Sequence, residues 1–581
     1  MTPSARDVTS TPQGVQGFSG ALWHVARRAP PELFSALEEL PPLVVQVLHN
    51  RGHAEVERIR EFFNEPLLPH DPFLMRDMDK AVSRVSQAVR DGERVCIYGD
   101  YDVDGISATA MLVETAILLG IDVCSYIPDR VEEGYGLNTE AVEKIVKDGV
   151  ALIITADCGT TADEEVACAA DAGIEVIVTD HHHADAVPSR ATAVLNPNSP
   201  DSDYPFTGLS GVGVAYKFVQ ALAEEYPEKL PYPETFLDLV ALGTIADVVP
   251  LRDENRGFVI DGLEVLRQGQ RAGLRAIGAV AQRPIETVTS SDIGFGIAPR
   301  LNAAGRIAHA QLAFDLLREE STSRAEQMAN DLDALNTERR QLTEDAVSVA
   351  RQELGDDPAV FSVSEKFSPG VVGLAASRLS EEFGVPAFVG TLVDGLVRGS
   401  ARSPQGFHLA QFLGRHAELL ETWGGHARAA GFTVQPVNVP KMRAALVKEC
   451  RELEGDVFVG PQLHADGRVF PGTISLETFQ DLDQLAPWGE GHDQPCLVVE
   501  NVCVQTARLV GANHLLLTFR EVAKDIRAIW FQSGQHQADM TPGVCVDVAF
   551  RLDLNVYRGE TRVQMVVDDV RPSTGERSLK E

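Results

Sequence analysis

The sequence predicts an α/β protein in three parts: a parallel-sheet domain, a smaller α/β domain joined to it by a long helix, and an all-β barrel at the C-terminus. Three observations carry this prediction. Short apolar strands alternate with helical segments over residues 78–200, which is the pattern of right-handed βαβ units in a parallel sheet. Residues 321–354 are periodic and contain no Gly or Pro. From about residue 462 onward the chain changes to short strands.

The first domain is predicted from its strands and helices in turn. Buried-strand patterns occur at residues 94–100, 122–128, 151–157, 174–180 and 193–198. Helical patterns lie between the first four strands, at residues 106–120, 137–149 and 162–172, and two of these helices end at a Gly. Residues 211–267 are expected to be mainly helical and to complete the domain.

The rest of the chain is divided by changes in its pattern. Residues 321–354 predict one helix of roughly 50 Å, long enough to connect two domains with a cleft beside it. Residues 358–435 again mix strands and helices, and the later short strands indicate a small barrel. The expected boundaries are an N-terminal tail and helical lead-in at 1–75, the parallel-sheet domain at 76–320, the connecting helix at 321–356, the second α/β domain at 357–460, the barrel at 461–575 and a C-terminal tail at 576–581.

The composition is that of a globular protein, with 581 residues, of which 44% are hydrophobic and 23% are charged. No stretch approaches the roughly 20 apolar residues of a membrane-spanning helix. The first 17 residues are polar and lack the apolar core of a signal peptide, so they are expected to be a disordered tail. The eight cysteines are scattered without CxxC pairs, which predicts reduced core thiols in a cytoplasmic protein.

The net charge of −34 allows two interpretations. Either an acidic surface binds a partner and no polyanion, or a generally acidic surface, as in high-salt organisms, surrounds a local basic channel. The chain has 10 Lys and 41 Arg among its 51 basic residues. Scarce Lys beside abundant acidic residues favours the second interpretation, although high-GC coding would also enrich Arg.

Aspartates stand at the ends of three predicted strands, at Asp100, Asp157 and Asp180. In parallel sheets the carboxyl ends of the strands line the ligand crevice. The first strand continues as DYDVDG, and in extended backbone the alternate residues Asp100, Asp102 and Asp104 would share one face. The sequence therefore predicts that several carboxylates converge at one edge of the sheet.

Converging carboxylates repel one another unless a cation neutralises them. Asp247, at the end of an apolar helical run, and the run His181–His183 after Asp180 are further candidate ligands. Oxygen ligands with one or two imidazoles suit Mn²⁺, Mg²⁺ or Fe²⁺, and more than four ligands indicate two metals about 4 Å apart. A single Asp after a strand is usually a turn or a helix cap, and a His run is usually solvated loop, but their combination favours a metal site.

These residues are similar to the four motifs of the DHH phosphoesterases, here DYDVDG, ADCGT, DHH and the later Asp247. Further segments resemble the RecJ branch of that family, the bacterial single-strand-specific 5′→3′ exonucleases: IYGDYDVDGISATA, GYGLN, SGVGVAYK, GTIADVVPL, PRLNAAGRI, GGHARAAGF and APWGEGHDQPCLV. The resemblance runs in order from about residue 40 to 575. It implies a DHH domain, a connecting helix, a DHH-associated domain and a C-terminal OB-fold barrel.

The resemblance also implies a role for each matching residue of the metal site. Two divalent ions, Mn²⁺ or Mg²⁺, would be held by Asp102, Asp104, Asp157, His181 and Asp247, with Asp157 as the bridge. His182 would face the scissile phosphate, and Asp100 would be a ligand or a carboxylate that supports the ligands. Asp180 would orient its neighbours by hydrogen bonds, and His183, which lies beyond the family motif, would be solvated loop.

Basic and small residues would bind the DNA. Arg130, Arg300, Asn302 and Arg306 would border the DNA channel, although Asn302 could instead shape a turn and the arginines could pair with surface acids. In the DHH-associated domain the resemblance implies contacts from Gly424, Gly425 and His426 to a phosphate backbone, and a 5′-phosphate pocket at Ser400 and Arg402. Phe367 and Ser368 stand where family members usually carry Trp-His, which would remove a stacking or phosphate contact.

The expected activity is 5′→3′ degradation of single-stranded DNA to mononucleotides by two-metal hydrolysis, in recombination and DNA repair. The alternatives are another DHH phosphoesterase acting on short oligonucleotides or cyclic dinucleotides, and a non-catalytic scaffold of a repair or replication assembly. The chain is further expected to be a cytoplasmic monomer without membrane association, and the resemblance implies single-strand-binding protein and a RecQ-type helicase as partners. The barrel aromatics Trp488, Phe519, Trp530 and Tyr557 either stack on bases or lie in the core.

Overall fold

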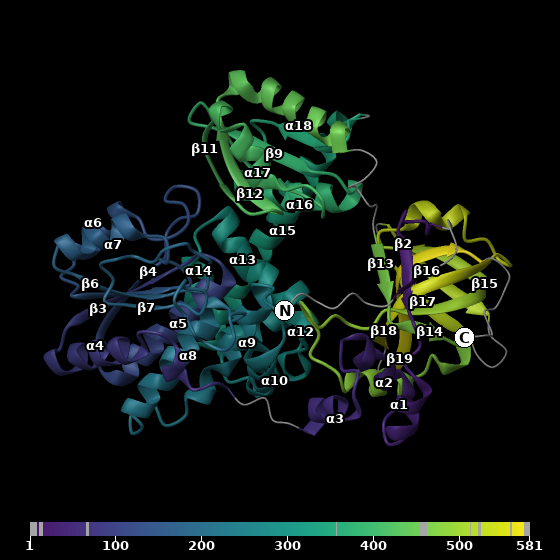
Figure 1. Ribbon diagram of the computed structural model, residues 1–581, viewed down its shortest axis with the longest axis horizontal. Coiled ribbons are helices and arrows are strands. Elements are labelled where there is room, and N and C mark those ends of the chain that lie inside the picture. The colour runs from purple at the N-terminus through teal and green to yellow at the C-terminus, as the bar shows by residue number, and fades with distance from the viewer. Residues whose placement is uncertain are drawn as a thin grey trace. The chain divides into compact units, whose positions relative to one another are not determined.

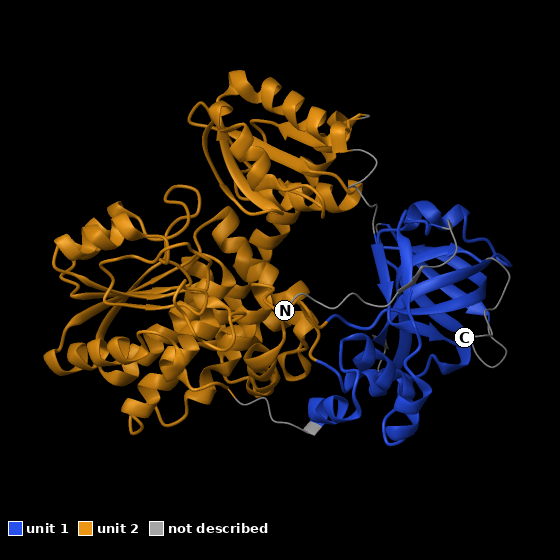
Figure 2. Cartoon of the chain, in the orientation of Figure 1, with its two compact units in different colours: residues 1–66, 458–486, 493–581 blue, residues 67–457, 487–492 orange. Residues whose placement is uncertain are grey.

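The protein divides into two compact units, which Figure 2 shows in different colours. Unit 1 comprises residues 1–66, 458–486 and 493–581, and unit 2 comprises residues 67–457 and 487–492. The computed structural model describes residues 8–10, 16–64, 69–355, 357–453, 462–511, 513–520, 525–557 and 560–573. The C-terminal tail expected at 576–581 lies outside the described residues, and the predicted domain boundaries stay a prediction.

Unit 2 begins with a five-stranded sheet in which every neighbouring pair is parallel, as the strand–helix alternation predicted. Across the sheet the strands are β4 (Asp122–Tyr126), β3 (Arg94–Gly99), β5 (Leu152–Ala156), β6 (Glu175–Thr179) and β7 (Ala193–Leu195). One face is covered by α4 (Met78–Asp91), α5 (Val103–Leu119) and α8 (Gly211–Glu225), and the other by α6 (Thr139–Lys147) and α7 (Asp163–Asp171). Figure 1 shows α6 and α7 on the opposite side of the sheet from α4.

The strands form a layer between two hydrophobic cores because their side chains alternate between the faces. Ile97 and Ile154 belong to the core beneath α5 and α8, whereas Cys96 and Ile153 belong to the core beneath α6 and α7. A parallel sheet buried on both faces requires this nearly continuous apolar run. The polar residues that follow the strands are thereby displayed at the carboxyl edge.

A helical region completes the first domain and leads into a long helix. Its elements are α9 (Leu237–Ala246), α10 (Asp253–Arg267), α11 (Ala272–Val280), α12 (Ser290–Asp292), a π-helix (Ile293–Ile297), α13 (Ala298–Ile307) and α14 (Gln311–Arg318). The predicted continuous helix is confirmed as α15 (Thr322–Leu354). Its first half buries Ala325 and Leu332 in the core of the first domain, and its second half buries Val347 in the core of the next domain. This helix therefore connects the two domains of unit 2.

The second α/β domain contains a five-stranded mixed sheet. Its strands, in order across the sheet, are β11 (Leu420–Gly425), β12 (Ala429–Val434), β10 (Leu396–Arg402), β9 (Ala387–Val393) and β8 (Val360–Val363). Only β8 and β9 are parallel; the other neighbours are antiparallel. The helices of this domain are α16 (Val372–Phe383), α17 (Leu409–Arg415) and α18 (Val439–Leu453).

Unit 1 contains the predicted all-β barrel. Its sheet has the order β14 (Gly467–Val469), β15 (Leu497–Val510), β16 (His514–Arg520), β17 (Ile526–Trp530), β19 (Glu560–Pro572) and β18 (Cys545–Tyr557). An additional pairing of β15 with β18 closes the ring of strands. The short helix α19 (Leu476–Asp483) precedes β15.

The N-terminal segment belongs to unit 1 and differs from its prediction. It forms β1 (Val8–Ser10), β2 (Leu22–Ala26), α1 (Pro31–Ala36), α2 (Pro42–Asn50) and α3 (Val56–Asn64). The expected disordered tail is therefore wrong at residues 8–10, where β1 pairs with β2, and β2 in turn pairs with the distant β13 (Gln462–Ala465). Trp23 Nε1 also donates to Asp569 Oδ2 at 2.8 Å. Pairing across more than 400 residues leaves no trace in the local pattern of either segment.

Two cysteines also differ from their prediction. Cys503 on β15 and Cys545 on β18 lie opposite each other, with Cα atoms 4.0 Å apart, and form a disulfide. The other six cysteines are not in disulfides, as predicted. The spacing of cysteines along the chain does not show which of them the barrel brings together. Among the described residues, no helix has the length and apolar composition to cross a membrane.

Candidate metal centre

The carboxyl edge of the parallel sheet carries the three strand-end aspartates. Asp100 follows β3, Asp157 follows β5 and Asp180 follows β6, and all three are buried. Asp157 has φ +65°, a left-handed conformation that costs a non-Gly residue free energy. Gly211, at the start of α8, lies close to it, because a Cβ added to that glycine would be 2.3 Å from Asp157 Oδ1. A glycine at this place lets the helix approach the carboxylate.

The extended arrangement expected for DYDVDG is wrong at Asp104. Helix α5 begins at Val103, directly after Asp102, whose carboxylate caps it by accepting from the Gly105 amide at 3.1 Å. Asp104 therefore lies in the first helical turn. Its carboxylate accepts from the backbone amides of Gly211 at 2.6 Å and Val212 at 2.9 Å. The N-cap, and not strand alternation, sets the direction of this side chain.

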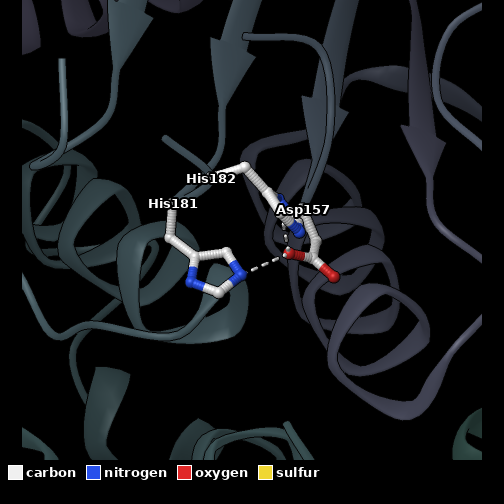
Figure 3. Close-up of side chains that lie close together, drawn as sticks. All are labelled: Asp157, His181 and His182. Atoms are coloured by element: carbon white, nitrogen blue, oxygen red, sulfur yellow. Dashed lines mark ion pairs between the residues drawn. The ribbon is translucent and has the colours of Figure 1, made fainter. Parts of the chain in front are cut away.

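His181 lies beside Asp157, as Figure 3 shows, and Asp247 approaches the same imidazole. Its Nε2 is 3.2 Å from Asp157 Oδ1 and 3.5 Å from Asp247 Oδ2. Asp247 directly follows α9, so a helix end and two strand ends meet at one imidazole. The structure thus brings the fourth predicted motif to the first three.

His182 is held differently from His181. Its Nδ1 is 2.7 Å from Asp180 Oδ1, and it lies 4.0 Å from Asp157 Oδ1. The same Asp180 oxygen also accepts from the backbone amides of His181 and His182. Tyr135 contributes a hydroxyl 3.0 Å from His182 Nδ1, and this hydroxyl also donates to the backbone carbonyl of Asp157. The GYGLN motif contains Tyr135, but nothing in its local pattern indicated that this tyrosine belongs to the site.

The side chains form three overlapping sets whose ligand atoms lie within 4.8 Å of one another: Asp104, His181 and Asp247; Asp100, Asp102 and Asp157; and Asp157, His181 and His182. Within the described residues, three buried atoms at the centre have no hydrogen-bond partner: Asp100 Oδ1, Asp157 Oδ1 and His181 Nε2. Buried polar atoms without a partner are costly. A divalent cation would satisfy all three, so the residues present fit a metal centre with Asp157 shared between two sets.

The protonation of the carboxylates depends on neutralisation of their charge. Burial, and then the neighbouring Asp104 carboxylate, raises the pKa of Asp247 to about 9. Burial, and then Asp102, raises the pKa of Asp104 to about 7, and burial is also the main cause that raises the pKa values of Asp100 and Asp157. Carboxylates so close together can all be ionised only beside a concentrated positive charge.

The two histidines have opposite proton affinities. Burial, together with the nearby His182, lowers the pKa of His181 to about 4, so at neutral pH its imidazole is in the neutral form that binds metals. Burial acts to lower the pKa of His182 as well, but its hydrogen bond to Asp180 and the charge of that carboxylate raise it to about 9. His183 is exposed and, among the described residues, its side chain has no hydrogen bond or ion pair.

Three arginines lie near the cluster of Asp100, Asp102, Asp104, Asp157 and Asp247, which we call the acidic centre. They are Arg130, Arg306 and Arg402, and none of them has an acidic ion-pair partner among the described residues. Burial, and then Arg130 and Arg339, lowers the pKa of Arg306 to about 10, and burial followed by Arg130 lowers the pKa of Arg402. The Arg130 guanidinium lies 4.7 Å from the centroid of the Tyr101 ring. Ser400 lies next to Arg402, since a Cβ on Gly373 would lie within 3.5 Å of both side chains. Arginines from both domains of unit 2 therefore gather in one place.

Other predicted substrate residues have different surroundings. Arg300 is engaged by Asp333 at 2.8 Å and by the Gly296 carbonyl at 2.7 Å, which is the surface-pair alternative. Asn302 accepts from the Val103 amide at 3.1 Å and so supports the first turn of α5. Within the described residues, no hydrogen bond or ion pair joins the acidic centre to three exposed residues at the end of β11: Gly424, Gly425 and His426.

The barrel aromatics are mostly unavailable for stacking. Phe519 and Trp530 are buried in unit 1. Trp488 stacks on His492 with ring centroids 5.3 Å apart, within the segment that belongs to unit 2. The side chain of Tyr557 lies outside the described residues.

The comparisons with known proteins agree with this arrangement. Three family models match, described as "DHH family, N-terminal domain" at residues 94–244, "DHHA1 domain" at 356–452 and "RecJ OB domain" at 465–569. The single-stranded-DNA-specific exonuclease RecJ of Bacillus subtilis is 36% identical over 94% of this chain and 70% of its own length. Its Escherichia coli counterpart is 32% identical over 94% of this chain and 98% of its own length. The chain belongs to the RecJ family.

A solved RecJ structure has the same fold. The RecJ of Thermus thermophilus, crystallised in complex with Mn²⁺, matches with a TM-score of 0.80 and 29% identity, covering 96% of this chain and 81% of that chain. A second structure, of an exonuclease RecJ bound to manganese, matches with a TM-score of 0.59 and 33% identity, covering 66% of this chain and 96% of that chain. The predicted combination of a DHH domain, a DHH-associated domain and an OB-fold barrel is confirmed for this RecJ-family protein.

Proposed function

We propose that this RecJ-family protein is a metal-dependent exonuclease that degrades single-stranded DNA from the 5′ end to mononucleotides, in recombination and DNA repair. The observation that carries the proposal is the acidic centre, where three buried ligand atoms have no hydrogen-bond partner among the described residues and Asp157 is shared by two ligand sets. The names of the relatives, which describe single-stranded-DNA-specific exonucleases, support it, as do the Mn²⁺-bound and Mg²⁺-bound RecJ structures.

Two of the three ligand sets share no residue, so each could hold one cation. Asp104, His181 and Asp247 would hold one cation, and Asp100, Asp102 and Asp157 the other. Two bound Mn²⁺ or Mg²⁺ ions would activate a water molecule and neutralise the charge that develops on the scissile phosphate. Asp157 belongs to the second set, and its Oδ1 lies 3.2 Å from His181 Nε2 of the first set, so it is the residue best placed to serve both cations. Neutral His181 can donate a lone pair to a cation, whereas a protonated His182 cannot.

His182 is the residue best placed to donate a proton to the substrate. Burial lowers the pKa of His182, but the hydrogen bond from its Nδ1 to Asp180 and the charge of that carboxylate raise it, which favours the protonated ring. Nε2 is then available to donate to the phosphate or to the leaving 3′ oxygen. Asp180 accepts hydrogen bonds from the backbone amides of His181 and His182, so it fixes the orientation of both residues together.

The arginine group supports recognition of a 5′ end. Arg130, Arg306 and Arg402 have no acidic partner among the described residues, and Ser400 adds a hydroxyl beside Arg402. A terminal phosphate dianion would satisfy these groups, because guanidinium forms two parallel hydrogen bonds to phosphate. This group would be the local basic site within a chain of net charge −34.

Digestion of end-labelled single strands tests the proposal. With Mn²⁺ or Mg²⁺ the protein should release mononucleotides from 5′-phosphorylated strands and spare duplex DNA, and chelation by EDTA should stop the reaction. Asp157→Asn should abolish turnover while far-UV circular dichroism stays unchanged. Degradation from 3′ ends, or hydrolysis of short oligonucleotides alone, would contradict the assignment.

The setting of the activity is also part of the proposal. From the family resemblance, we infer a cytoplasmic monomer that cooperates with single-strand-binding protein and a RecQ-type helicase. Sedimentation of the purified chain tests the monomer, and stimulation of digestion by each purified partner tests the cooperation. A stable dimer, or rates unaffected by either partner, would overturn the corresponding part.

A further inference from the structure

Asp247 stands at the start of a strained loop. Val248, the next residue, has φ +59°, which is costly for a β-branched side chain and persists only where surrounding contacts hold it. Val248 is 62% exposed, so its own packing does not supply these contacts. The position of the Asp247 carboxylate therefore depends on contacts made further along the loop.

Residues 487–492, PWGEGH, make such contacts, and we call this segment the clasp. The Leu251 amide donates to the Glu490 carbonyl at 2.8 Å, and the Arg252 guanidinium lies 3.3 Å from the Gly491 carbonyl through both Nε and Nη2. Gly489 lies against the Leu251 side chain, because an added Cβ would be 2.6 Å from Leu251 Cδ1. The clasp thus contacts the loop at Leu251 and Arg252, the fourth and fifth residues after Asp247.

The clasp is itself a compact turn that is hydrogen-bonded to the first domain of unit 2. Gly489 and His492 exchange two backbone hydrogen bonds, of 3.1 and 3.0 Å. The Ser290 hydroxyl donates to the Trp488 carbonyl at 2.7 Å and accepts from the Trp488 amide at 3.2 Å. Arg256, buried in α10, is 3.3 Å from the Pro487 carbonyl. These bonds fix the clasp on two helices of the same domain.

The sequence on both sides of the clasp belongs to the other unit. The RecJ OB domain match spans residues 465–569, yet the chain leaves unit 1 after Ala486, contributes the clasp to unit 2 and returns at Asp493. The motif APWGEGHDQP is therefore not a strand of the barrel. Its middle part packs as an element of the first domain of unit 2, although it lies more than 200 residues after Asp247 in the sequence.

We propose that the clasp is a positioning element for Asp247. It holds the strained Val248–Arg252 loop so that the Asp247 carboxylate stays with Asp104 and His181, the set that would share one cation. Removing the contacts of the clasp should weaken binding of that cation and leave the other unchanged. This inference rests on the proposed metal-dependent function.

The test measures Mn²⁺ binding by the full-length protein, by calorimetric titration and by EPR, which separates a spin-coupled pair from a single ion. The double variant Arg252→Met with Ser290→Ala removes side-chain contacts to the clasp. It should weaken one of the two Mn²⁺ sites by about 10- to 100-fold, the usual cost of losing a group that orients a ligand. The other site should change by less than about twofold.

Three matched variants make the result specific. Asp247→Asn should weaken the same site, and adding the double change to it should cause no further loss, since the clasp acts through Asp247. Ser290→Thr as a single change keeps the hydroxyl and should leave Mn²⁺ binding at both sites as in the wild type. Arg190→Met is the control, because Arg190 also donates to a backbone carbonyl, that of Ala167 in α7, and pairs with Asp171 at the helix end away from the metal edge.

The outcomes separate the two proposals. Unchanged Mn²⁺ affinity at both sites in the double variant would overturn the role of the clasp and leave the proposed function intact. Equal weakening of both sites, or further loss in the Asp247→Asn background, would show general destabilisation and would also overturn it. A wild-type protein that binds no Mn²⁺ would overturn the proposed function instead. If circular dichroism shows that the double variant is unfolded, the single variants are judged by the same criteria.

Discussion

Three consecutive histidines follow β6, and each has different surroundings. His181 Nε2 lies between Asp157 and Asp247, His182 Nδ1 is bound to Asp180, and His183 is exposed. The difference arises because the buried Asp180, which follows β6, accepts from the amides of His181 and His182 and from His182 Nδ1, but not from His183. Adjacent residues of the same type can therefore have unequal roles.

Single alanine substitutions should separate these histidines. His181→Ala should lower both Mn²⁺ affinity and turnover, because it removes a ligand. His182→Ala should lower turnover by about 10²- to 10⁴-fold, the usual contribution of a positioned acid, with Mn²⁺ affinity less affected. His183→Ala should change turnover by less than about twofold. Initial rates on a 5′-phosphorylated oligonucleotide and Mn²⁺ titrations measure both quantities, and loss of activity in His183→Ala would refute the assignment.

At the scale of elements, the approach of α8 to the strand ends shapes the centre. The first two amides of this helix bind Asp104, and its first residue, Gly211, lies against Asp157. A helix N-terminus favours a nearby negative charge through its dipole and its free amides. The helix can reach both carboxylates only because its first residue has no side chain.

Gly211→Ala should therefore impair catalysis. The added Cβ would lie 2.3 Å from Asp157 Oδ1, so the carboxylate or the helix must shift. A displacement of about 1 Å at a reacting centre can cost about 10²-fold in rate. Gly294→Ala is the matched control, because its Cβ would meet nothing closer than 3.7 Å. The measurement is the initial rate of each variant on the same oligonucleotide. If Gly211→Ala were as fast as Gly294→Ala, the prediction would be wrong, because the centre would tolerate the shift.

The elements also show where sequence reasoning succeeded and where it stopped. The strand-end positions of Asp100, Asp157 and Asp180 were predictable, because strand–helix alternation determines a parallel sheet and its carboxyl edge. The start of α5 was not predictable, because the residues after Asp102 can either continue as extended backbone or begin a helix that Asp102 caps. Arg300 was expected beside the DNA but pairs with Asp333, a partner that only tertiary packing reveals.

At the scale of the molecule, long-range pairings were the least predictable features. The N-terminal strand β2 pairs with β13, and the clasp belongs to a different unit from its flanking sequence. Local periodicity contains no information about which distant segment completes a sheet or supports a loop. The family models identify the domains but not this exchange of segments, which the structure alone shows.

The charge of the molecule leads to a prediction about salt. A chain of net charge −34 repels DNA as a whole, while under the proposed function Arg130, Arg306 and Arg402 would attract phosphate locally. Added salt weakens the attraction by counterion release, but it also screens the repulsion, so the two effects oppose each other. KM for a single-stranded oligonucleotide should therefore rise less steeply with salt than for DNA-binding proteins without such a surface.

The measurement is KM across about 0.05 to 1 M KCl, plotted on logarithmic axes. Arg402→Met would remove one of the proposed phosphate contacts and should raise KM at every salt concentration while reducing the slope by about 1. Arg398→Met is a matched control, since Arg398 lies on the same strand, β10, but is paired with Asp394. Strong inhibition already near 0.2 M KCl would contradict the screening argument, because it would mean that the local attraction alone determines binding.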